Sequence, residues 1–172
     1  TMQQTAYNKF KWSAKYTMKI AQQLYENGYI TYHRSDSLNL SNSALEMAKN
    51  FIIKNFGKNY YQFRKYKTKS KTAQEAHEAI RPTFAENSPE KLKNKLEKNQ
   101  LKLYDLIWQR FIASQASQAI FASQIINISA KNYTFQATGQ TLKFDGFLKF
   151  YPIQYKENIL PLLQKDEILK LK

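Results

Sequence analysis

The sequence contains no cysteine, no long apolar run and few acidic residues. The absence of cysteine excludes disulfides and thiolate metal sites, and it is compatible with a reducing cytoplasm. No apolar stretch approaches the roughly 18 residues that a membrane-spanning helix needs, and no signal-peptide pattern opens the chain. We therefore expect a soluble cytoplasmic protein with no membrane partner.

Charge is the strongest feature of the composition. The chain has 27 Lys and Arg against 13 Asp and Glu, which gives a net charge of +14 and a pI near 9.8. Residues 58–118 hold 13 of the basic and 6 of the acidic side chains, so this third carries half of the excess. Such a balance indicates a polyanionic partner, either a nucleic acid or an anionic membrane surface, although a lysine-rich proteome would explain part of it. A membrane surface would favour one basic amphipathic helix, whereas the basic excess here lies mainly in a loop, so we expect a nucleic acid.

The first half of the chain has helical periodicity. Residues 1–27 are predicted to be helical, with Ser13 as an N-cap and Gly28 as the stop. A second helix is predicted over about 42–56, because Ser43 and Glu46 match a capping box and Gly57 follows.

Later segments change from helices to strands. The pattern predicts a short helix over 72–80, a helix that starts at Pro89 and a wide apolar helix over about 100–117. From about residue 121 the period becomes two, with a turn at Lys131-Asn132 and further strands at 142–144, 147–151 and 168–171. The expected class is mainly α with a C-terminal antiparallel β segment (α+β), divided into a helical domain over 1–118 and a β segment over 119–172.

The stretch Gly28-Tyr29-Ile30-Thr31-Tyr32-His33-Arg34-Ser35-Asp36-Ser37 contains a potential nucleophile, possible proton carriers and a guanidinium. A phenol has a pKa of about 10 and is a poor nucleophile at neutral pH, so phosphate chemistry at Tyr32 would need a nearby cation such as Arg34. In an extended segment these two side chains share a face. From these residues alone, a packed strand tyrosine beside a surface arginine remains the simpler interpretation.

Two further features suit a phosphate backbone. The run 64–71 alternates basic residues with Tyr66 and follows Phe63, a pattern that can hold single-stranded nucleic acid by phosphate pairing and base stacking but is more often a solvated loop. On the predicted helix over 72–80, His77 and Arg81 are four residues apart and could contact one phosphate.

The two blocks together resemble the type IA DNA topoisomerases, the family of bacterial DNA topoisomerase I. The segment around Tyr32 is similar to the family's active-site segment, and Ala73-Gln74-Glu75-Ala76-His77-Glu78-Ala79-Ile80-Arg81-Pro82-Thr83 is similar to a second signature downstream of it. With Leu142-Lys143-Phe144-Asp145-Gly146, the resemblance extends over nearly the whole chain.

The resemblance implies that this is an internal piece of a longer, monomeric enzyme of the bacterial nucleoid that relaxes DNA without ATP. In it, the Tyr32 hydroxyl would form a 5′-phosphotyrosine link to single-stranded DNA, and Arg34 would hold the scissile phosphate. The implied DNA-binding residues are His77, Arg81, Thr31, Asp36, Lys69 and Lys71, of which Asp36 would orient Arg34 or the nearby backbone. We expect the piece alone to bind DNA without cleaving it.

Where the sequence departs from the family, His33 takes the place of an apolar residue or proline, and we interpret it as variation rather than as a proton donor. The family's Mg²⁺ site lies in an acidic domain with no counterpart here, so no metal is expected in this chain itself. A non-catalytic single-stranded nucleic-acid binding module is the main alternative. The two are distinguished by whether Tyr32, Arg34 and His77 converge in the fold.

Overall fold

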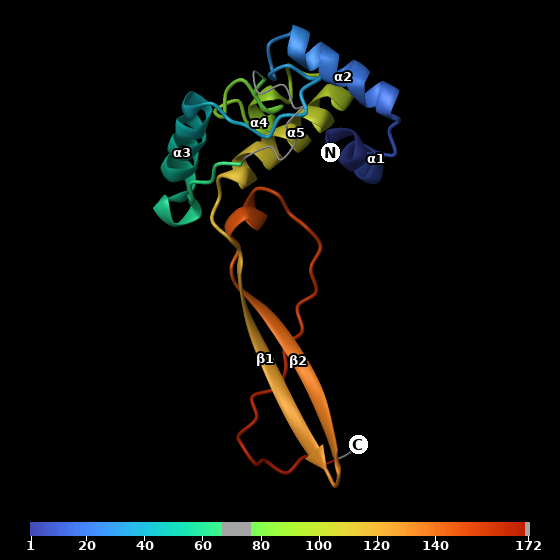
Figure 1. Cartoon of the computed structure of the whole chain (residues 1–172), viewed down its shortest axis with the longest axis vertical. Coiled ribbons are helices and arrows are strands. Elements are labelled where there is room, and N and C mark those ends of the chain that lie inside the picture. The colour runs from blue at the N-terminus through green and yellow to red at the C-terminus, as the bar shows by residue number, and fades with distance from the viewer. Residues whose placement is uncertain (67–76, 171–172) are drawn as a thin grey trace.

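The computed structural model describes residues 1–66 and 77–170, and it shows a helical body from which a long β-hairpin projects (Figure 1). The helices are α1 (Met2–Phe10), α2 (Ala14–Glu26), α3 (Asn42–Phe56), α4 (Pro89–Leu92) and α5 (Lys98–Ser114), with short 3-10 turns η1 (Lys58–Tyr60) and η2 (Gly146–Lys149). Strands β1 (Ile120–Ala130) and β2 (Tyr133–Phe144) form the hairpin. The predicted α+β class is confirmed.

Local capping explains most helix ends. Ser13 caps α2 by accepting a hydrogen bond from the Tyr16 amide, as predicted, and Gly57 follows α3. The predicted capping box at Ser43 was wrong, because the side chain of Ser41 accepts from the Ala44 amide and begins α3. The single helix predicted over 1–27 is two helices, because Lys11 adopts a left-handed conformation with φ of 60°.

Helix α5 lies at the centre of the helical body, and α2, α3 and α4 all pack on it. Its apolar face is buried, and two of its aromatic side chains also reach the connection before α4: the Trp108 indole donates to the Ala85 carbonyl (2.9 Å), and the Tyr104 hydroxyl donates to that of Asn87 (2.6 Å). These bonds fix the chain that leads from the 79–83 segment into α4. The predicted helix over 100–117 is therefore confirmed in its centre, although it ends three residues earlier, at Ser114.

The hairpin follows its predicted alternation. Strands β1 and β2 pair antiparallel from Ile120↔Phe144 to Ala130↔Tyr133, and the turn residue Lys131 has a φ of 53°. The strands predicted over 147–151 and 168–171 were wrong in the described residues, because 146–149 form η2 and 168–170 are irregular. Of the apolar side chains in these two segments, Leu148 and Phe150 are buried and Ile168 is exposed.

The hairpin joins the helical body through η2. The amide of Phe147 donates to the Ser117 carbonyl (2.8 Å), and the Tyr60 hydroxyl donates to Asp145 (2.7 Å). The ring of Phe150 packs edge-on against Phe56, with ring centroids 4.7 Å apart. Residues 146–151 thus pack on the helical body although they follow the hairpin in sequence, and the boundary predicted at 118/119 stays a prediction.

The chain after η2 returns along the hairpin (Figure 1). Asn158 pairs with Gln140 through two backbone hydrogen bonds of 2.8 and 3.1 Å. A Cβ atom at Gly139, the residue before Gln140, would lie 2.8 Å from the Asn158 carbonyl oxygen, so this close approach of the two backbones needs a glycine. The return segment covers part of β2, and the rest of the two-stranded sheet keeps open edges.

Candidate active site

A short backbone ladder holds the residues before Tyr32 against residues 79–83. Helix α2 ends next to Gly28, whose φ of 74° is a left-handed conformation that suits glycine. The Thr31 amide then donates to the Arg81 carbonyl (2.9 Å), and the Thr83 amide donates to the Tyr29 carbonyl (3.0 Å). The ladder joins the two sequence blocks that were predicted to form one site.

This ladder explains why the predicted helix over 72–80 is wrong in its described part. Residues 77–81 are not helical, because their backbone groups bond to other segments. The Ala79 amide donates to the Asn39 carbonyl (2.8 Å), and the Arg81 amide donates to the hydroxyl of Thr31 (3.0 Å). His77 and Arg81 therefore do not share a helix face, and residues 72–76 lie outside the described part of the chain.

Thr31 uses its hydroxyl within the protein. The hydroxyl donates to the Ala79 carbonyl at 2.8 Å and accepts from the Arg81 amide. Both donor and acceptor capacities are thus engaged by the ladder, which gives Thr31 a structural task. Its predicted contact with DNA stays a prediction.

Arg81 is also engaged within the protein. Its guanidinium forms a two-pronged pair with Glu78, at 2.9 Å from Nε and 2.7 Å from the second terminal nitrogen, and it donates to the Pro82 carbonyl. Glu78 in turn accepts from the Ser41 amide at the start of α3 (2.8 Å). Burial alone would raise the pKa of the Glu78 carboxyl, but the hydrogen bonds from Arg81 and Ser41 outweigh it and lower that pKa. Arg81 therefore fastens the ladder to α3.

Tyr32 lies at the surface beside His77, with 39% of its side chain exposed. The two ring centroids are 5.7 Å apart, although the residues are 45 positions apart in sequence. The ring of Tyr32 also meets that of Tyr25 at 5.4 Å, edge to face. The structure thus brings the predicted nucleophile and one predicted phosphate ligand together, and it adds Tyr25, which the sequence did not single out.

His33 and Arg34 follow Tyr32 in a turn rather than in the extended conformation expected from sequence. Arg34 is exposed like Tyr32, whereas His33 between them is buried. Burial lowers the pKa of His33, the positive charge of Arg34 lowers it further, and the Glu26 carboxylate opposes both. Arg34 is therefore available to solvent and to an anion, and its predicted convergence with Tyr32 and His77 stays a prediction.

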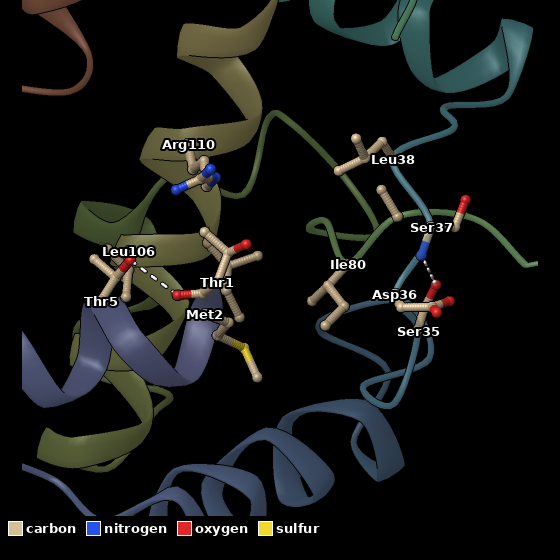
Figure 2. Close-up of a pocket in the computed structure, with 12 residues that line it drawn as sticks. Thr1, Met2, Thr5, Ser35, Asp36, Ser37, Leu38, Ile80, Leu106 and Arg110 are labelled. Atoms are coloured by element: carbon tan, nitrogen blue, oxygen red, sulfur yellow. Dashed lines mark hydrogen bonds between the residues drawn. The ribbon is translucent and has the colours of Figure 1, made fainter. Parts of the chain in front are cut away.

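Asp36 lines a cleft of about 260 Å³ between the tyrosine segment and the helical body (Figure 2). Ser35, Ser37 and Ile80 lie on one side of this cleft, and Arg110 of α5 lies on the other. The Ser37 amide donates to the Ser35 hydroxyl (3.1 Å), which tightens the chain around Asp36. The predicted orientation of Arg34 by Asp36 stays a prediction.

The structure describes only residues 64–66 of the basic run 64–71, and Lys69 and Lys71 lie outside the described residues. Within its described beginning, the Arg64 guanidinium donates to the Ala116 carbonyl and to Gln62, and the Tyr66 hydroxyl donates to the Ser114 carbonyl (3.2 Å). These residues are attached to the end of α5, which corrects the expectation of a wholly solvated run. Phe63 and Lys65 remain exposed.

Among residues 1–66 and 77–170, no group of three or more His, Cys, Asp or Glu side chains could hold a metal ion. The Mg²⁺ site predicted for another domain stays a prediction. In the same part of the chain, no helix has the length and apolarity to cross a bilayer.

Comparison with known proteins gives a consistent result. A family model described as DNA topoisomerase matches residues 1–172. DNA topoisomerase 1 of Helicobacter pylori is 43% identical over 99% of this chain and 25% of its own length, and that of Campylobacter jejuni is 44% identical over 99% and 26%. Full-length topoisomerase I from Thermotoga maritima superposes with a TM-score of 0.79 at 36% identity, over 95% of this chain and 28% of that one. The chain thus spans about a quarter of the length of these relatives.

Proposed function

The chain belongs to the DNA topoisomerase family, and on this premise we propose that it carries the nucleophile of a type IA enzyme, Tyr32. The observation that carries the proposal is the exposed ring of Tyr32, placed 5.7 Å from His77 by a ladder that joins the two sequence blocks. A tyrosine that only packed would be expected to bury its ring. The position of Tyr32 instead leaves it accessible to a DNA strand.

In the proposed reaction, the Tyr32 oxygen attacks a phosphodiester of DNA. A bond forms between that oxygen and phosphorus, the bond from phosphorus to the 3′-oxygen breaks, the phenol loses its proton and the 3′-oxygen gains one. The product is a 5′-phosphotyrosine and a free 3′-hydroxyl. Because the new phosphodiester retains the bond energy, the reverse attack can reseal the strand without ATP after another strand has passed.

The residues around Tyr32 divide this task unevenly. Arg34 follows it by two residues, is exposed, and can bind the scissile phosphate and stabilise its developing charge. Arginine stays protonated, so it cannot accept the phenol's proton or donate one to the 3′-oxygen. His77 touches the Tyr32 ring and can contact a phosphate near the break. We assign proton transfer to the remainder of the intact enzyme. We further infer that the intact enzyme is monomeric and cytoplasmic.

The proposed substrate at the site is a single-stranded segment. Tyr25 and Tyr32 are 41% and 39% exposed, and unpaired bases can stack on such rings, whereas bases within a duplex cannot. The net charge of +14 supports contact with the phosphate backbone.

The test is covalent trapping on the full-length parent protein with labelled single-stranded DNA. Tyr32→Phe removes one oxygen and should abolish the adduct that survives denaturing electrophoresis. Tyr25→Phe is the matched control, because it removes the same oxygen from a ring 5.4 Å away and should leave an adduct. If no adduct forms in the wild type while DNA still binds, the alternative of a non-catalytic binding module gains support.

A further inference from the structure

Three rings form a closed triangle at the site. The ring centroids of Tyr25 and Tyr32 are 5.4 Å apart, those of Tyr32 and His33 are 5.4 Å apart, and those of Tyr25 and His33 are 5.5 Å apart. Two of these contacts are edge to face, an arrangement that aromatic pairs favour. The ring of Tyr32 is thus located by two others rather than by its own backbone alone.

His33 is the buried member of the triangle. Its side chain is 6% exposed, whereas Tyr25 and Tyr32 are each about 40% exposed. Both of its ring nitrogens are buried and have no hydrogen-bond partner in the described part of the chain. Buried polar atoms without partners are uncommon, because each loses its hydrogen bonds with water. A residue chosen only for packing would be expected to be apolar here.

The neutral and charged forms of the His33 imidazole differ in the free-energy cost of their burial. The neutral ring leaves a single N–H unpaired, whereas the imidazolium would bury a charge and two unpaired N–H groups. Of the groups that act on it, the adjacent Arg34 is a cation and disfavours protonation, and Glu26 of α2 favours it weakly. Tyr25 and Tyr32 contact it as neutral rings. Of these three rings, the one that His77 contacts is that of Tyr32.

We propose that His33 is a positioning residue: its neutral imidazole holds the Tyr32 ring against Tyr25, and protonation releases that ring. This inference rests on the proposed role of Tyr32 as the nucleophile. When His33 gains a proton, its charged ring moves toward water, the triangle opens, and the ring of Tyr32 loses its fixed place beside His77. The site therefore becomes less competent as the pH falls.

The first test needs no catalysis. Proton NMR of the 172-residue chain between pH 8 and 5 follows the His33 ring, the Tyr32 ring and the cross-peaks between them. His77→Gln serves as the background, so that the His77 ring does not contribute to changes in the Tyr32 signals. We expect His33 to titrate below the ordinary value of about 6.5, with the Tyr32 signals following the same midpoint and the cross-peaks disappearing. In His33→Phe the ring contacts should persist at every pH.

The second test measures the initial rate of adduct formation by the full-length parent protein. His33→Ala should lower the rate by up to about 100-fold at pH 8, the scale expected when a reacting group is misplaced by about 1 Å. His33→Phe should restore it to within about two-fold and remove the decline in rate that His33 causes at acid pH.

Three results would overturn the proposal: a His33 midpoint at or above 6.5, Tyr32 signals that ignore that midpoint, or a His33→Phe variant as slow as His33→Ala. If Tyr32 forms no adduct at all, the proposed function fails, whereas the NMR result still decides whether His33 positions the ring.

Discussion

Thr31→Val separates a structural from a DNA-binding role at the residue before the proposed nucleophile. The substitution keeps the side chain's shape but removes the hydroxyl that donates to the Ala79 carbonyl and accepts from the Arg81 amide. Both partners are partly buried, and each lost hydrogen bond should cost about 1 kcal/mol, with the unpaired Arg81 amide adding to that. We therefore expect the free energy of unfolding to fall by about 2 kcal/mol.

Urea unfolding of the 172-residue chain measures this loss. With a slope of about 2 kcal/mol per molar urea, the midpoint should move down by about 1 M. Thr83→Val is the matched control, because its hydroxyl makes a single bond, to the Gly28 carbonyl, at an exposed position. We expect the control to lose less than half as much. DNA affinity, measured where both variants are folded, should be nearly unchanged.

The opposite pattern would refute this reasoning. If Thr31→Val kept the stability of the wild type and lost DNA affinity by tenfold, the hydroxyl would be a DNA ligand and the ladder would not depend on it. Equal losses of stability in the two valine variants would show that burial of the Thr31 hydrogen bonds does not increase their contribution to the free energy of unfolding.

Four further outcomes are expected. Because folding lowers the pKa of Glu78, this residue stabilises the chain above its unfolded pKa of about 4.5, and the contribution is lost as the pH falls through the folded value; Glu78→Gln should remove that part of the acid sensitivity in pH-dependent unfolding. Arg34→Ala should slow adduct formation by the full-length parent protein by about 3 kcal/mol of activation free energy, and Arg34→Lys should recover only part of it, since lysine lacks the two-pronged geometry. In salt titrations, single-stranded DNA should bind more tightly than a blunt duplex, with a slope of about −0.7 per phosphate contacted, and equal affinities would contradict this. That slope should shrink when four lysines are replaced together: Lys65, Lys67, Lys69 and Lys71. Hydrogen exchange should open β1 and β2 before α5, because the hairpin lacks a second layer, and slower exchange in the strands would mean that they form a self-sufficient sheet.

The elements predicted correctly from sequence are those whose causes are local. The helix over 42–56 has its periodicity and its terminal Gly57 within one segment, and the hairpin has alternation on both sides of a two-residue turn. The error over 77–81 arose because local helix signals there are overridden by pairing with Thr31, whose partners lie about 50 residues away. The local sequence pattern does not indicate a pairing between segments so far apart in the chain.

The candidate site shows the same division. Tyr32 and Arg34 were singled out by the resemblance of their segment to the topoisomerase family, and the structure leaves both exposed. Arg81 looked equally suitable for a phosphate, yet its guanidinium is held by Glu78. The burial of His33 could not be predicted either, because it depends on how the end of α2 places Tyr25 over the turn. For Arg81, the sequence did offer one signal of its ion pair: the acidic residue Glu78 lies three positions before it.

The most direct test of the central claim is to identify the residue that carries DNA in the trapped adduct of the full-length parent protein. After nuclease and trypsin digestion, the relevant peptide spans residues 20–34 and contains three tyrosines, at positions 25, 29 and 32. We predict that tandem mass spectrometry will locate the nucleotide mass on Tyr32 and that Tyr32→Phe will remove it. A nucleotide on Tyr25 or Tyr29, or an adduct that persists in Tyr32→Phe, would contradict the assignment of Tyr32 as the nucleophile.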